Sequence, residues 1–194
     1  MTTIDSHTGI PILASRFHED WYLMGSLSEV IADACKHTVS RHVLSHDAEL
    51  LRSGLSSIDV EKLWLSCLDG SFTFGPEGTV ASGPALMEMI LQECRRFGVE
   101  EPTYRADFSE GYRDAVVAEV KAFGEEGYPL MSGRLLRCAD KCSPDLAFRF
   151  LLETYHALSV DIDESRYESL RKIGEGLGYD PLVVVRVAAL VEDA

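Results

Sequence analysis

Apolar residues recur at helical spacing along most of the chain, and this periodicity limits the fold more than any other feature. The segment that follows Ser26 repeats at i, i+3, i+4, i+7 and i+8 through Leu27, Val30, Ile31, Ala34 and Cys35. This spacing places the apolar side chains on one face of an α-helix. Similar segments follow one another, separated by glycines and prolines. The sequence therefore predicts an all-α fold, a multi-helix bundle of about nine helices.

Capping residues mark where these helices begin. Ser26 and Glu29 have the spacing of a capping box, in which each side chain bonds the backbone N–H of the other residue. Ser56 and Asp59 have the same spacing. The pair Ser143-Pro144 combines a capping side chain with a first-turn proline. We expect helices to start directly after these serines, whereas residues 182–191 form a last helix after another proline.

The helical pattern is interrupted between residues 69 and 82. Several glycines and a proline lie close together there, and Phe72 and Phe74 alternate with other residues. This composition is typical of a turn. A phosphate-binding loop is not indicated, because the segment lacks the required lysine and the preceding apolar strand. We predict a short aromatic turn or hairpin near residues 70–80.

A polar stretch that contains a proline separates two helical regions at residues 98–108. Stretches of this kind are typical of domain boundaries. We therefore divide the chain into residues 1–97 and residues 98–194. The second region is either independent or packed on the first as one unit.

Acidic residues outnumber basic ones by 32 to 18, for a net charge of −14, and both halves share the excess at −6 and −8. This charge argues against a nucleic-acid partner and against an anionic membrane surface, and it suits a cationic partner. The most apolar run, residues 182–191, is shorter than the roughly 20 residues of a membrane span. No signal-peptide core is visible near residue 1. We expect a cytoplasmic protein.

No enzyme motif is present, and we predict no catalytic residue, metal or cofactor. The nearest approach to a metal site is the pair His42 and His46, which share a helical face, with Asp47 and Glu49 close in sequence. A solvated polar face is the simpler interpretation. The five cysteines are an odd number, and without an export signal they favour reduced, structural thiols.

The segment just before the helix at Ser26 has an unusual composition, Phe17-His18-Glu19-Asp20-Trp21. Aromatic side chains so close together are typical of an anchor on a helical core. We predict that Phe17 and Trp21 pack on the core, and that His18 and Asp20 bond the backbone of the following turn. These four residues are thus assigned to the integrity of the fold.

The same segment resembles the opening of a family of immunity proteins from bacterial contact-dependent growth inhibition (CDI) systems. The family pattern is Phe-His-x-Asp-Trp, then a spacer and an acidic residue within a Val-Ile helix, here Glu29-Val30-Ile31. The aromatic turn at residues 70–74 and the helix at residues 85–94 also match. The resemblance covers about residues 15–97. The remainder is a second module of the same class, a toxin-contacting extension or a fused unrelated domain.

The resemblance implies a function in binding rather than in catalysis. Such proteins bind a cognate CDI toxin domain in the cytoplasm and keep it inactive, and these toxins are often nucleases with basic grooves. The net charge of −14 suits a cationic toxin as partner. Loops on a rigid scaffold are common binding sites. We therefore select the acids around the irregular turn as toxin-binding candidates: Asp59, Glu61, Asp69 and Glu77.

Two functions from other classes stay open at this stage. One is a small metal-dependent helical enzyme that uses His42 and His46. The other is a generic helical adaptor for a different partner protein.

Overall fold

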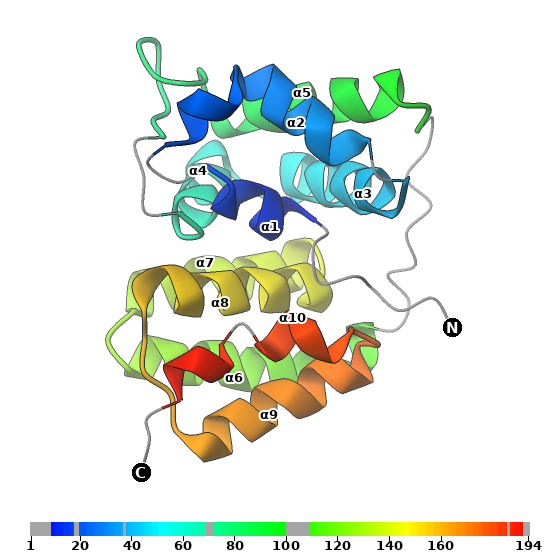
Figure 1. Cartoon of the computed structure of the whole chain (residues 1–194). Helices are drawn as coiled ribbons and strands as arrows, with labels where there is room; N and C mark the ends of the chain where they lie inside the picture. The colour runs from blue at the N-terminus through cyan, green and yellow to red at the C-terminus, as the bar shows by residue number, and fades with distance from the viewer. Residues whose placement is uncertain are drawn as a thin grey trace. The chain divides into compact units, whose positions relative to one another are not determined.

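The computed structural model describes residues 9–17, 20–36, 38–68, 72–99, 109–185 and 187–191. Within these ranges it contains ten α-helices and no β-strand (Figure 1), which confirms the predicted all-α, multi-helix bundle. The chain separates into two compact units. We call the described residues up to 99 the N-terminal unit and those from 109 onward the C-terminal unit. Within the described ranges, no helix combines the length and the apolar character needed to cross a membrane.

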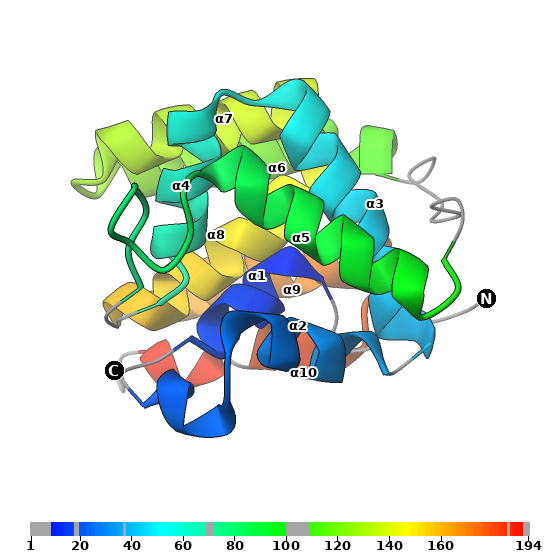
Figure 2. The ribbon, with the colours of Figure 1, turned by 90° about the horizontal axis from the view of Figure 1, so that it is seen from above.

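The N-terminal unit has five α-helices and one 3₁₀ helix. They are α1 (Ile10–Ser15), η1 (Trp21–Met24), α2 (Leu27–Cys35), α3 (Thr38–Gly54), α4 (Ser57–Leu65) and α5 (Gly83–Arg96). Helices α3 and α5 form the main packed pair (Figure 2). Helices α2 and α4 each contact both members of this pair, and α1 contacts α3 and α4. The apolar faces predicted from the spacing therefore meet in one core.

The predicted capping box at the start of α2 is confirmed. The backbone N–H of Ser26 donates to the Glu29 carboxylate at 2.7 Å, and the N–H of Glu29 donates to the Ser26 hydroxyl at 3.3 Å. The bonds from Ser26 lower the pKa of the Glu29 carboxyl. Ser56 and Ser143 likewise accept a backbone hydrogen bond at the starts of α4 and α8.

The segment between α4 and α5 closes as a turn, as predicted. The N–H of Thr79 donates to the carbonyl of Thr73 at 2.8 Å, and Phe74 and Val80 form an isolated bridge. A Cβ atom at Gly78 would lie 2.7 Å from the Thr73 carbonyl oxygen, so the backbone approach requires glycine there.

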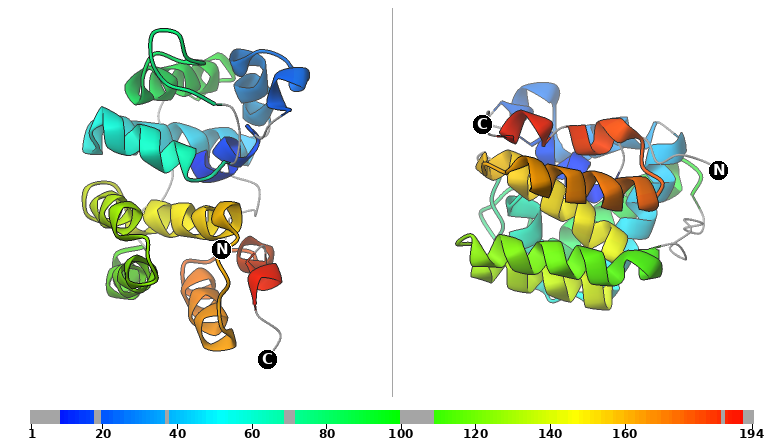
Figure 3. Two further views of the ribbon diagram at one scale, coloured as in Figure 1. Left: turned by 90° about the vertical axis from the view of Figure 1, so that its left-hand side faces the viewer. Right: turned by 90° about the horizontal axis from the view of Figure 1, so that it is seen from below.

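The C-terminal unit has five α-helices and two 3₁₀ helices. They are η2 (Ser109–Tyr112), α6 (Arg113–Glu125), α7 (Pro129–Lys141), α8 (Pro144–Leu158), α9 (Glu164–Gly176), α10 (Pro181–Val185) and η3 (Ala188–Leu190). Helices α6, α7 and α8 pack on one another, and α9 lies between α6 and α10 (Figure 3, right).

The prediction of a last helix over residues 182–191 was wrong in its extent. The structure has the short helix α10 and the separate 3₁₀ helix η3 instead. The valines at positions 183–185 are β-branched, and such residues lose side-chain freedom in a helix. The N–H of Ile162 donates to the carbonyl of Leu190 at 2.9 Å, which ties η3 to the segment before α9.

Helix α9 is held in the C-terminal unit by a network around Arg166. The guanidinium lies 2.7 Å from the Glu119 carboxylate of α6 and 2.7 Å from the Glu126 carboxylate. It also lies over the Tyr155 ring of α8, 5.8 Å from the centroid. The side chains of Arg166 and Glu119 are only 15% and 12% exposed, so this pair is shielded from solvent screening. Burial raises the pKa of the Tyr155 phenol.

We expect Arg166→Ala to lower the free energy of unfolding by about 2–4 kcal/mol, because it leaves the shielded Glu119 carboxylate without its cation. Arg171→Ala is the matched control on α9, since Arg171 pairs with Glu168 and Glu175 of its own helix and is 38% exposed. Its loss should change the free energy of unfolding far less, because exposed ion pairs contribute little to stability. Urea unfolding followed by circular dichroism measures both values. Equal effects of the two substitutions would contradict a stabilising role of the network.

Candidate binding site

Three aromatic rings from separate segments of the N-terminal unit surround the ring of Phe17. Its side chain is 0% exposed. The Phe17 ring centroid lies 5.1 Å from that of Trp21, 5.4 Å from that of Trp64 and 5.4 Å from that of Phe72. Edge-to-face and tilted arrangements at these distances are favourable. We call these four residues the aromatic cluster; it joins the segment after α1 to η1, α4 and the aromatic turn.

The structure describes only part of the segment between Phe17 and Trp21. His18 and Glu19 lie outside the described residues. Asp20 is exposed at the start of η1, and its side chain makes no capping hydrogen bond there. The backbone provides the contact instead, because the Asp20 carbonyl accepts from the N–H of Leu23 at 3.0 Å. The first turn of η1 is thus closed through its own backbone, without a side-chain cap from Asp20.

Directly after Trp21 in the sequence, η1 presents three consecutive apolar side chains to solvent. Tyr22, Leu23 and Met24 are 59%, 74% and 53% exposed. We call these three residues the exposed turn. Trp21 anchors it at one end, and at the other Gly25 has φ +127° and directs the chain into the capping box of α2. The turn is thus fixed at both ends while its apolar groups face water.

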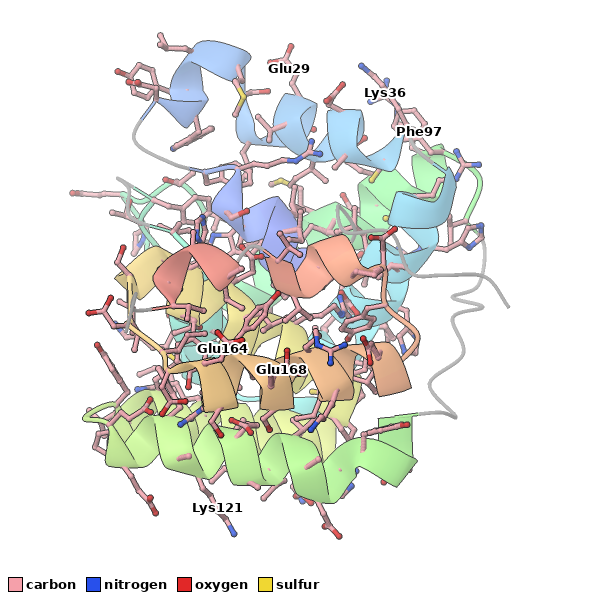
Figure 4. All side chains as sticks on the ribbon, turned by 60° about the horizontal axis from the view of Figure 1, so that its bottom comes forward. Glu29, Lys36, Phe97, Lys121, Glu164 and Glu168 are labelled. Atoms are coloured by element: carbon pink, nitrogen blue, oxygen red, sulfur yellow. The ribbon has the colours of Figure 1, made fainter. Side chains whose placement is uncertain are left out.

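A cavity of about 500 Å³ lies beside the exposed turn. Met24, Val30 and Phe97 contribute apolar wall, and the lining also includes both acidic and basic residues. Figure 4 labels Lys36 and Phe97, which lie near each other at the C-terminal ends of α2 and α5. Lys36 pairs with Asp33 at 2.8 Å, so its charge is already balanced. The cavity therefore suits an apolar group more than a free ion.

The four acidic toxin-binding candidates do not share one role. Asp59 is only 7% exposed, and its carboxylate accepts a hydrogen bond from the Ser56 hydroxyl at 2.8 Å. Glu61 accepts from the N–H of Gly83 at 3.0 Å and thereby links α4 to the start of α5. Glu77 is exposed in the aromatic turn. Asp69 lies outside the described residues. Of the three described candidates, Glu77 has the most accessible carboxylate.

The carboxylates near His42 and His46 are engaged elsewhere. The Asp47 carboxylate accepts the backbone N–H of Ile10 at 2.9 Å at the start of α1, and Asp47 is 0% exposed. Glu49 pairs with Arg52 at 2.9 Å. Over the part of the chain that the structure describes, no group of three His, Cys, Asp or Glu side chains is placed to hold a metal ion.

The exposed turn was not recognised from the sequence as a binding feature. Its signal was nevertheless present, because four apolar residues in succession cannot all face the core from a single helical turn. The chain matches no protein-family model, and no curated protein and no solved structure is significantly similar to it. The assignment of function therefore depends on the sequence motif and on the geometry of this site.

We expect Phe17→Ala to lower the free energy of unfolding by about 3–5 kcal/mol, because it removes the central ring of the aromatic cluster. Tyr22→Ala is the control, since it removes a largely exposed ring five residues away and should change stability by about 0.5 kcal/mol or less. Trp21→Ala, at the edge of the cluster, should fall between them. Urea unfolding measures all three. A Phe17→Ala protein as stable as the parent would contradict the anchoring role.

Proposed function

We propose that this chain is an immunity protein that neutralises a cognate CDI toxin by stoichiometric binding in the cytoplasm, without catalysis, metal or cofactor. The proposal begins from the resemblance of the Phe17–Trp21 motif and the elements behind it to CDI immunity proteins. The geometry of the N-terminal unit adds a physical reason for a binding function.

The exposed turn is the observation that supports this proposal most. Protein interfaces are enriched in Tyr and Met, and a few apolar anchors supply most of their binding energy. Here such side chains are held outward by an anchored backbone, which reduces the ordering entropy lost on binding. The neighbouring cavity offers space for an apolar side chain from the partner. The exposed turn and the adjacent cavity together give this surface the shape that a specific protein contact requires.

The acidic charge supports a cationic partner. A net charge of −14 accelerates encounter with a basic protein, and a nuclease toxin carries a basic groove for its substrate. Glu77 on the aromatic turn and Glu164 on α9 (Figure 4) are examples of exposed carboxylates. In this proposal, charge determines the rate of association and the exposed turn determines how long the complex lasts.

The decisive experiment is co-expression with the C-terminal toxin domain that, under this proposal, the gene directly upstream encodes. We expect cells that make this protein to survive the toxin, and a one-to-one complex to persist through gel filtration. Killing of such cells, with no complex recovered, would disprove the proposal. If the cells survive but the recovered complex contains a different protein in place of the toxin, the result would favour a generic adaptor.

Leu23→Asp tests the exposed turn within that complex. We expect it to raise the dissociation constant at least about tenfold, because it places a charge where an apolar contact forms. Ile58→Asp is the matched control, since Ile58 is 58% exposed on α4 of the same unit. Glu77→Lys should mainly slow association at low salt. Surface plasmon resonance measures the association rate and the dissociation rate separately. Equal dissociation rates for Leu23→Asp and Ile58→Asp would exclude the exposed turn as an anchor.

A further inference from the structure

Two buried thiols face each other between α2 and α5. The sulfur atoms of Cys35 and Cys94 lie 3.5 Å apart, and both residues are 0% exposed. Cys35 is the last residue of α2, and Cys94 lies in the last turn of α5. Cys67, also buried in this unit, lies just past the end of α4 and instead donates to the carbonyl of Leu63 in that helix. The close thiol pair therefore differs from a cysteine that only fills core space.

We propose that Cys35 and Cys94 are an oxidisable pair that a hydroperoxide converts into a disulfide linking α2 to α5. This assignment goes beyond the proposed function and does not depend on a toxin partner.

The position of the two thiols favours this bond. A disulfide requires a sulfur–sulfur distance of about 2.05 Å, so the two sulfurs have to approach by roughly 1.5 Å. Cys35 lies at a helix end, and the next residue, Lys36, is exposed. Helix ends open locally at a low free-energy cost, which gives an oxidant access and lets the end of α2 move.

The hydrogen bond between the thiols differentiates their reactivity. The two thiols share a hydrogen bond in which either sulfur can be the donor, and this bond lowers the pKa of Cys35 and raises the pKa of Cys94. The charge of Arg41 favours thiolate at both positions and that of Glu93 opposes it. The thiolate is the nucleophile, and Cys35, the last residue of α2 beside the exposed Lys36, is the thiol that an oxidant reaches first when the helix end opens.

The chemistry balances with one peroxide for each pair. The Cys35 thiolate attacks a peroxide oxygen and the O–O bond breaks, which gives a sulfenic acid and a hydroxide that takes up a proton. The Cys94 sulfur then attacks the Cys35 sulfur, the S–O bond breaks, and the second oxygen leaves as water with the Cys94 proton. Two thiols are oxidised to one disulfide while hydrogen peroxide is reduced to two molecules of water.

The disulfide would act on the cavity beside the exposed turn. One part of the cavity wall is formed by α2 and the residue after it, through Val30, Asp33 and Lys36. Another part is formed by the end of α5, through Arg96 and Phe97. Cys35 and Cys94 lie on these same two segments. A covalent bond between them fixes the separation of the two cavity walls, so oxidation sets the shape of the recess.

The test uses the full-length protein, reduced and then treated with hydrogen peroxide while folded. We expect the thiols titrated after unfolding to fall from five to three. Peptide mapping by mass spectrometry should recover Cys35 and Cys94 in one linked pair. The melting temperature should rise by about 5–10 °C, because the bond closes a long loop, and dithiothreitol should reverse the rise.

Three variants provide the controls. Cys35→Ala and Cys94→Ala should abolish both the linked peptide and the rise in melting temperature, and Cys67→Ala should retain both. If either variant of the pair fails to fold, the peptide map of the parent protein still decides. Retention of all five thiols, or a linked peptide that contains Cys138 and Cys142 instead, would overturn the proposal.

Discussion

The N-terminal unit depends on the burial of one ring, that of Phe17. Its neighbours Trp21, Trp64 and Phe72 come from η1, α4 and the aromatic turn, and these segments share no continuous helix. The conformation of a short 3₁₀ helix and of a glycine-containing turn is stabilised little by its own hydrogen bonds. Contact with a common ring orders both of them at once. The exposed turn is presented only because the residue that precedes it, Trp21, belongs to this cluster.

The features that the sequence predicted correctly are local ones. The capping box of Ser26 and Glu29 spans three residues, and the apolar stripe of α2 spans little more than two turns, so both are visible in a short window. The failure at α10 is also local and concerns its end: the helix begins at the predicted proline, Pro181, but stops after three consecutive valines, which have poor helix propensity. Helix positions could thus be predicted, whereas the contacts between helices could not.

The site residues show where such predictions end. Glu61 was selected as an acid near the irregular turn, but its carboxylate accepts a hydrogen bond from the N–H of Gly83, 22 residues away. Arg166 meets Glu126 across 40 residues, and no spacing rule relates the two. The cavity has walls from both α2 and the end of α5, so it exists only once the helices are packed. Charge and motif could suggest a binding protein, but the surface that binds follows from tertiary contacts.

Charge and apolar contact act over different distances in the function we propose. The attraction of a net charge of −14 for a cationic protein reaches about one Debye length, roughly 8 Å at physiological salt. It brings many basic proteins close but cannot select one, because any basic surface satisfies it. The exposed turn and its cavity act only at contact and depend on shape. Specificity therefore has to come from the small apolar part of this surface, and a change there would alter the choice of toxin with little effect on the encounter.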